Sequence, residues 1–192
     1  GNYFYRARTN DRLARALQIG GLMAGAVVVG SAGSQPPRDR VMVLLASTDS
    51  VVNSVPAGDS INFSFNERSW PSTEKLTATV GDTLHWRVIN ANNDFHPMHL
   101  HGFYYRVDQF TGPPLGSQRP VAPDGMVVTQ RLTPFSAMSM TWVPERAGNW
   151  LFHCHFQIHV ARQPSLSDGS AEPAHANHAM TGMIGLVMGI IV

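Results

Sequence analysis

Residues 149–155 read Asn-Trp-Leu-Phe-His-Cys-His, and they place the only cysteine of the 192-residue chain, Cys154, between His153 and His155. The apolar start of this stretch predicts a β-strand. Strand side chains alternate between two faces, so the two histidines point one way and the cysteine points the other. Because a thiolate with nearby imidazoles is a ligand set for copper or zinc, one strand could hold two metal sites back to back.

A second stretch repeats this pattern upstream. Residues 94–102 read Asp-Phe-His-Pro-Met-His-Leu-His-Gly, with three histidines inside six residues. His99 and His101 share a face of the expected strand, whereas His96, on the other side of Pro97, has the opposite parity. Both stretches therefore carry an imidazole pair on one face and a further ligand on the other, which favours metal binding over a buried core thiol as the role of Cys154.

The rest of the chain predicts an all-β fold. Short apolar runs alternate with turn signals such as Gly81-Asp82 and Ala147-Gly148-Asn149, which is typical of a Greek-key β-sandwich or barrel. The strands are expected at residues 41–46, 61–66, 76–80, 83–90, 98–110, 126–132, 137–143, 149–155 and 183–192.

The chain divides unequally along its length. Residues 48–192 are enough for one such domain with its own core, whereas residues 1–33 are not. Residues 1–33, with an expected final strand at 20–29, are interpreted as the end of a preceding domain, and residues 34–47 as a linker and first strand. Residues 162–179 are rich in Pro, Ser, Ala and Gly and predict a long surface loop.

Three further histidines receive ordinary interpretations. His175 and His178 are expected to be solvated residues of the long loop, and His85 a strand side chain.

Charge and cysteine content exclude some functions. A formal net charge of +1, with 14% charged residues, gives no basis for a nucleic-acid partner. The apolar run at 17–29 is shorter than the ~20 residues that span a bilayer, so no membrane span is expected. The single cysteine allows no internal disulfide, and copper ligation would account for a free thiol in a secreted or periplasmic protein. Any export signal would lie upstream of the printed sequence.

Residues 96–102, followed by residues 148–155 and His159, resemble the C-terminal cupredoxin domain of the multicopper oxidases, the laccase-like enzymes. The resemblance extends over residues 40–192 and implies copper as the cofactor. By position it assigns the ligands of each copper: His96, Cys154 and His159 to the type 1 copper, His99 to the type 2 copper, and His101, His153 and His155 to the type 3 pair.

The resemblance also implies an activity. A small donor, such as a phenol, an aromatic amine or a metal ion, would give single electrons to the type 1 copper. The electrons would pass through Cys154 and its flanking histidines to a trinuclear cluster that reduces dioxygen to water. Dioxygen reduction consumes protons, and Asp94 is a candidate donor in the hydrogen-bond network around the cluster. The alternative for Asp94 is a turn residue beside Asn92 and Asn93.

The axial type 1 ligand departs from the family pattern. The usual position after His159 holds Pro164, which has no donor side chain. The match resumes at residues 181–187, so Met183 is expected to supply the axial thioether, with Met180 and Leu186 as the alternatives. A leucine there would leave the copper three-coordinate.

The cluster ligands are incomplete. A full cluster needs eight histidines, and four would come from a first domain. Residues 3–8 resemble the strand that carries one of those pairs, but Arg6 and Arg8 stand where the histidines would be, and arginine does not ligate copper. An upstream cupredoxin domain or a partner subunit would therefore supply the missing ligands. Residues 1–33 fit either a copper-free middle domain or a first domain without these ligands.

Three functions remain open at this point. The first is an oxidase, and the second is a type 1 electron-transfer or copper-binding protein without a complete cluster. The third is a nitrite-reductase-like two-domain enzyme, which the His-Cys-His triplet disfavours because such a reductase needs one cluster histidine beside the cysteine. A zinc hydrolase would lack a convincing general base. For the printed segment alone, type 1 copper at most is expected.

Overall fold

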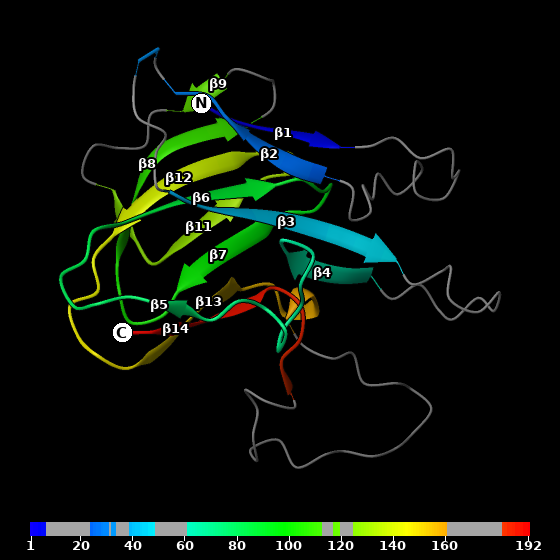
Figure 1. The fold of residues 1–192 in the computed structure, drawn as a ribbon. Coiled ribbons are helices and arrows are strands. Elements are labelled where there is room, and N and C mark those ends of the chain that lie inside the picture. The colour runs from blue at the N-terminus through cyan, green and yellow to red at the C-terminus, as the bar shows by residue number, and fades with distance from the viewer. Residues whose placement is uncertain are drawn as a thin grey trace, which may run out of the picture.

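The computed structural model describes residues 1–6, 24–30, 32–33, 39–48, 61–112, 117–119, 125–160 and 182–192. Their regular structure is almost entirely β-strand (Figure 1). The elements are β1 (Asn2–Arg6), β2 (Ala24–Val28), β3 (Arg40–Thr48), β4 (Ile61–Phe65), β5 (Leu76–Thr77), β6 (Leu84–Asn90), β7 (His96–Leu100), β8 (Tyr105–Gly112), β9 (Ser117–Arg119), β10 (Met126–Val127), β11 (Thr129–Leu132), β12 (Ala137–Trp142), β13 (Asn149–Cys154), the 3₁₀ turn η1 (Gln157–His159) and β14 (Val187–Ile191).

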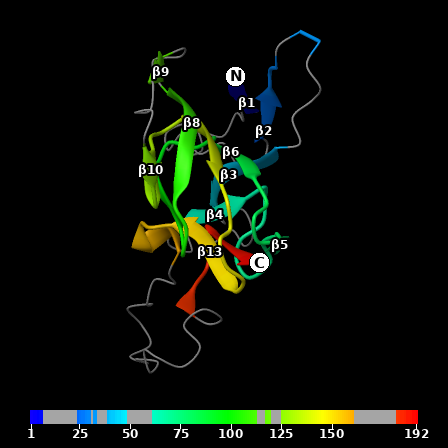
Figure 2. The same ribbon diagram turned by 90° about the vertical axis from the view of Figure 1, so that its left-hand side faces the viewer.

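Two facing sheets form the body of the fold (Figures 1 and 2). The larger has the order β10-β8-β12-β6-β3-β4, with β9 beside β8, and the smaller has the order β11-β7-β13-β14-β5. β3 runs parallel to β6 and β14 parallel to β5, whereas the other pairs are antiparallel. The predicted all-β sandwich is confirmed.

The main core fills the space between the sheets. Trp86 meets Trp142 and Phe152 edge to face, with ring centroids 5.1 and 5.2 Å apart, a geometry that aromatic pairs favour. Cys154 and Met98 are fully buried in the same apolar cluster. The cysteine therefore lies on the face of β13 that packs inward, as strand alternation predicts.

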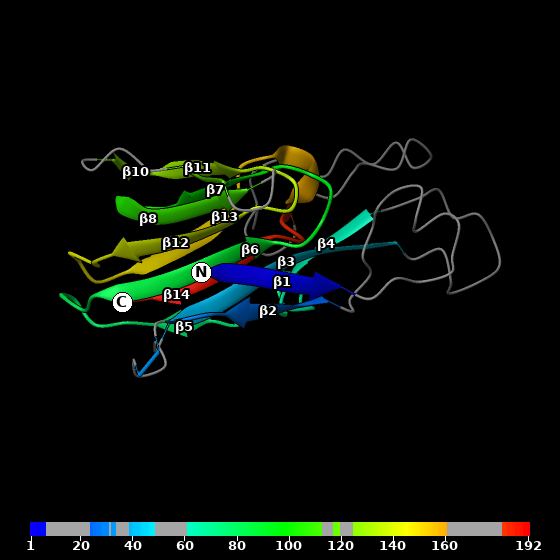
Figure 3. The same ribbon diagram turned by 90° about the horizontal axis from the view of Figure 1, so that it is seen from above.

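A hairpin of β1 and β2 covers the outer face of the larger sheet (Figure 3). Phe4, Ala24 and Ala26 pack on Val43 and Leu45 of β3. The alternate residues of β3 point into the main core, so both faces of this strand are buried. That explains why the sequence of β3 is a continuous apolar run. The assignment of residues 1–33 to a preceding domain remains a prediction.

Four expected strands are wrong in their extent. The strand predicted at 98–110 is two strands in different sheets, β7 and β8, and the strand predicted at 126–132 is likewise β10 and β11. Gly102 makes the first break, because its φ of +77° suits glycine and a Cβ there would lie 2.3 Å from the Trp150 ring. The strands at 76–80 and 183–192 shorten to β5 and β14, and β9 was not predicted.

Several predictions fall outside the described residues. These are the loop at 162–179 with His175 and His178, the alternative ligand Met180, the residue Arg8, and the first part of the strand expected at 20–29.

In the part of the chain that the structure describes, we find no helix with the length and apolar character needed to cross a membrane.

Candidate metal centres

The pairing of β13 with β7 brings the two histidine-rich stretches together. In this register His153 lies opposite His99, and Cys154 lies opposite Met98. Directly opposed residues project to the same face of a sheet. The imidazoles of His153 and His99 therefore share the outer face, while the thiol points into the sandwich toward His96.

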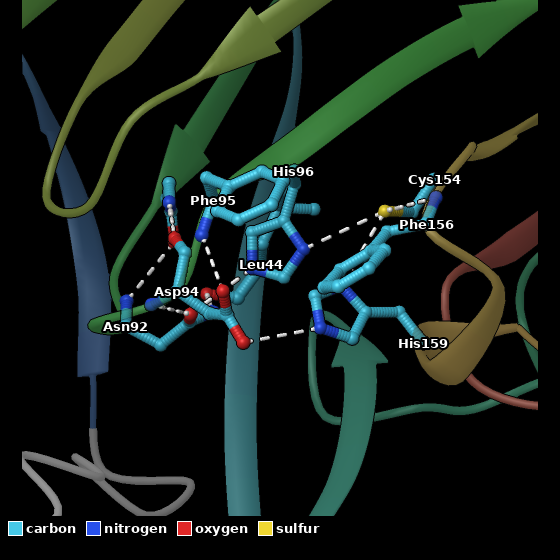
Figure 4. A network of polar contacts seen from close by, with 9 residues as sticks. Leu44, Asn92, Asp94, Phe95, His96, Cys154, Phe156 and His159 are labelled. Carbon is cyan, nitrogen blue, oxygen red and sulfur yellow. Dashed lines mark hydrogen bonds and ion pairs between the residues drawn. The ribbon is translucent and has the colours of Figure 1, made fainter.

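The inner group consists of His96, Cys154 and His159. Cys154 Sγ lies 3.7 Å from Nδ1 of His96 and 3.5 Å from Nδ1 of His159 (Figure 4), and one donor atom from each residue falls within a 4.8 Å set. All three residues are buried. Two imidazole nitrogens that converge on one thiol form the His₂Cys donor set of an electron-transfer copper, so the residues fit that metal.

His159 is held at this site by the C-terminal segment. Its backbone carbonyl accepts the N–H of Leu186, while the carbonyl of Leu186 accepts the N–H of Cys154. A Cβ at Gly185 would lie 2.2 Å from the His159 carbonyl oxygen, and the φ of Gly185 is +70°. Only glycine fits this close approach without strain. The ring of Phe63 in β4 packs on His159 at a centroid distance of 3.9 Å.

Burial keeps the inner ligands uncharged in the metal-free protein. It lowers the pKa of His96 to about 3, with a smaller effect from His159, and raises the pKa of the Cys154 thiol to about 12. Burial also lowers the pKa of His159, against the opposing effect of the Asp94 carboxylate. Metal binding would therefore displace one proton, that of the thiol.

The turn from Asn90 to Asp94 contacts both imidazoles of the inner group on their Nε2 side, away from Cys154 (Figure 4). His96 Nε2 lies 3.0 Å from Asn92 Oδ1, and His159 Nε2 lies 3.2 Å from Asp94 Oδ2. Each ring thus turns its Nε2 toward an oxygen and its Nδ1 toward the cysteine.

The outer group consists of histidines on the opposite face of β13. His99, His101 and His153 each offer a nitrogen within a 4.8 Å set, and Nε2 of His101 is 2.9 Å from Nε2 of His153. His155 follows the end of β13 and is exposed, with its ring centroid 5.3 Å from that of His99. The His155 nitrogens lie outside the 4.8 Å set.

These outer imidazoles are also suited to binding a metal. Burial, followed by neighbouring histidines, lowers the pKa of His153 to about 4, and the pKa values of His99 and His101 are lowered by the same causes. His153 Nδ1 lies 2.7 Å from the Cys154 carbonyl oxygen. Because a carbonyl only accepts, Nδ1 carries the proton and Nε2 is the free lone pair that faces His101.

The other predicted site residues lie at or near the inner group. Asp94 contacts His159, not the outer histidines. Met183 is half-buried, one residue before Ile184, whose N–H donates to the Val160 carbonyl next to His159. Arg6 lies in β1.

Two supporting residues were missed from the sequence. From the sequence, Asn92 is interpreted only as a turn residue, although its side-chain amide, four residues before His96, is a candidate hydrogen-bond partner of that imidazole. Thr129, whose Oγ1 lies 2.8 Å from His99 Nδ1, belongs to β11. It could be found only from the pairing of β11 with β7.

Comparison with known proteins identifies the family of this chain. The model of the multicopper oxidase family matches residues 37–167, a range that contains both histidine-rich stretches and His159. The chain therefore belongs to the multicopper oxidase family, whose members bind copper. The resemblance to the multicopper oxidase family is confirmed, and the His96, Cys154 and His159 group resembles a type 1 copper site. No sequence among the curated proteins matches significantly.

Solved structures share the fold at low sequence identity. The blue copper oxidase from Nitrosomonas europaea superposes with a TM-score of 0.68 at 19% identity, over 100% of this chain and 55% of that chain. The multicopper oxidase mgLAC gives 0.69 at 21%, over 100% and 56%. A copper nitrite reductase from Nitrosomonas europaea gives 0.59 at 16%, over 98% and 61%. These similarities confirm the cupredoxin-type fold, and the chain spans just over half the length of the first two proteins.

Proposed function

We propose that this chain takes single electrons from a reducing donor at a type 1 copper and passes them to a trinuclear copper cluster that reduces dioxygen to water. The type 1 ligands are His96, Cys154 and His159. The single observation that carries the proposal is that two metal-competent groups lie on opposite faces of β13 and meet at Cys154.

The chain itself provides a short path between the two groups. His153 is the covalent neighbour of Cys154, and its Nδ1–H donates to the Cys154 carbonyl oxygen over 2.7 Å. His155 is the neighbour on the other side. Copper, when bound, supplies the one-electron redox chemistry. The protein holds the thiolate, keeps His153 in one tautomer and excludes water from the inner group, where His159 has no exposed side-chain surface.

The outer group supports half of a cluster. His99 is proposed as a type 2 ligand, and His101, His153 and His155 as type 3 ligands. The remaining ligands are proposed to come from an upstream cupredoxin domain or a partner subunit, which makes this chain the C-terminal part of a larger oxidase. An extracytoplasmic location, secreted or periplasmic, is part of the same proposal.

One alternative has support in the sequence. A type 1 electron-transfer or copper-binding protein would need only the inner group, which is complete apart from its axial ligand. In that case the outer histidines would not assemble into a working cluster. The nitrite-reductase-like alternative shares the fold. Such a reductase, however, needs one cluster histidine beside the cysteine, whereas this chain has two, His153 and His155.

Copper content and oxygen uptake of the full-length protein distinguish these functions. We expect more than one copper per chain and dioxygen consumption with a phenol, an aromatic amine or a reduced metal ion as donor. The measurements are elemental analysis and an oxygen electrode, with the donor omitted as control. A blue protein with one copper per chain and no oxygen uptake would contradict the oxidase and support the electron-transfer protein.

We further propose that Met183 is the axial ligand of the type 1 copper. Its position near the His159 segment supports this, and Leu186 is the remaining alternative among the described residues. Met183→Leu is expected to shift the type 1 absorption and reduction potential, because the axial thioether tunes the potential. Met140→Leu, in the core on β12, is the matched control and should change neither. Unchanged spectra of the Met183 variant would exclude it as the ligand.

A further inference from the structure

We propose that one turn, Asn90 to Asp94, presets both type 1 imidazoles before copper binds. Asn92 and Asp94 each accept the Nε2–H of one imidazole, so that both Nδ1 lone pairs face Cys154, and Asp94 also adds a negative charge behind His159. The inference rests on the proposed type 1 site and assigns Asn92 and Asp94 as positioning residues.

Asn92 defines the tautomer of His96. Its Nδ2 donates to the Leu44 carbonyl over 3.3 Å, and its Oδ1 accepts the N–H of Asp94 over 2.9 Å. Oδ1 is therefore the acceptor that faces His96 Nε2 at 3.0 Å. An acceptor there requires the ring proton on Nε2, which leaves the Nδ1 lone pair toward Cys154.

Asp94 does the same for His159. A carboxylate only accepts, so the ring proton of His159 lies on Nε2, 3.2 Å from Asp94 Oδ2. The other carboxylate oxygen accepts the N–H of Phe95 over 2.8 Å, which limits rotation of the side chain. The Nδ1 lone pair of His159 is left facing Cys154 Sγ at 3.5 Å.

The turn that carries both residues is itself held from two sides. Nδ2 of the buried Asn90 donates to the Asp94 carbonyl over 2.6 Å and to the Thr133 carbonyl over 2.9 Å. Its Oδ1 accepts the N–H of Asn92 over 3.2 Å. One hydrogen-bonded turn therefore makes both ring contacts, although His96 and His159 are 63 residues apart in the chain.

The two positioning residues differ in charge and exposure. Asn92 is neutral and buried, whereas the Asp94 carboxylate is 38% exposed and lies beside Nε2 of a His159 side chain that has no exposed surface. A negative charge near copper favours the cupric over the cuprous form, and hydrogen bonding to a carboxylate raises the basicity of the ligand. Asp94 is therefore expected to lower the type 1 reduction potential, and Asn92 to affect ring orientation alone.

The metal-free full-length protein provides the first test. We expect ¹⁵N NMR to show His96 and His159 as Nε2–H tautomers. Asp94→Ala should remove this preference at His159 and weaken copper binding about 10–100-fold, the usual cost of losing such a partner. Asp94→Asn keeps an acceptor oxygen without the charge, so it should keep the tautomer and raise the type 1 reduction potential. Asp108→Asn is the control. The Asp108 carboxylate accepts a hydrogen bond from the Thr141 hydroxyl on the larger sheet, so its replacement should change neither the tautomer nor the reduction potential.

Different results would contradict the positioning role of Asn92 and Asp94 and the proposed type 1 copper function. An Nδ1–H tautomer at either ring, or an Asp94→Ala protein with unchanged tautomer and copper affinity, would overturn the inference while the wild-type protein still turns blue. An Asp94→Asn potential equal to the wild-type value would overturn the part that concerns charge. A wild-type protein that binds no blue copper would overturn the proposed function and, with it, the copper affinity and potential assigned to Asp94.

Discussion

Cys154→Ser protein is expected to lose the blue absorption of type 1 copper completely. That absorption arises from a copper–thiolate bond, and Cys154 is the only thiol of the chain. A serine hydroxyl is a harder, far less acidic donor and does not replace it. The absorption and EPR spectra of copper-loaded protein check the prediction. In the full-length protein, copper at the outer histidines should be retained, because they lie on the other face of β13.

The control must separate loss of the ligand from loss of the fold. Cys154 is fully buried in the main core, but the Nδ1 atoms of His96 and His159 lie 3.7 and 3.5 Å from its sulfur. A serine hydroxyl could therefore form a hydrogen bond, and its cost in unfolding free energy should stay below the ~1–3 kcal/mol of a buried polar group left unpaired. Thermal unfolding of the metal-free variant measures this cost. Met98→Leu changes the residue directly opposite Cys154 at nearly constant volume, for less than ~1.5 kcal/mol, and should stay blue. A blue Cys154→Ser protein would show that the type 1 ligand is elsewhere.

Strand alternation accounts for how well the site could be predicted. A period of two separates Cys154 from His153 within one strand, and it separates His96 from His99 in the same way. The period is identical in every strand, however, and does not say which sheet a strand joins. The apolar positions change parity at Gly102, from Met98 and Leu100 to Phe103, Tyr105 and Val107. This change marks a break in the strand but does not say that the chain crosses to the other sheet there. At this position a Cβ would clash with the ring of Trp150, 48 residues away.

The support of the site was harder to predict than its ligands. Asp94 adjoins the His96 stretch in sequence, which suggested a role at the cluster. The fold instead places its carboxylate on His159, 65 residues away. That contact depends on where η1 lies, and η1 is held by Gly185 and Leu186 from the end of the chain. The proton-donor role of Asp94 at the cluster stays a prediction, whereas its geometry supports the positioning role.

His153→Ala in the full-length protein is expected to keep the blue type 1 copper and lose oxygen uptake. His153 lies on the cluster face of β13, where its Nε2 meets His101 and its Nδ1–H donates to the Cys154 carbonyl. The substitution removes a proposed cluster ligand and the hydrogen bond that joins the two groups. Oxygen consumption should fall by at least the roughly 10–100-fold that follows loss of an outer-shell partner. An oxygen electrode and the absorption spectrum measure the two properties in one sample.

His85→Ala is the matched control, because His85 is an exposed histidine whose Nδ1 contacts Thr141 on the larger sheet. It should leave both colour and oxygen uptake unchanged. Undiminished uptake in the His153 variant would mean that electrons do not pass by this face of β13. Loss of the blue colour along with uptake would mean that the two groups depend on each other through the Cys154 backbone. Retained colour with lost uptake is the result that only two separate centres on one strand produce.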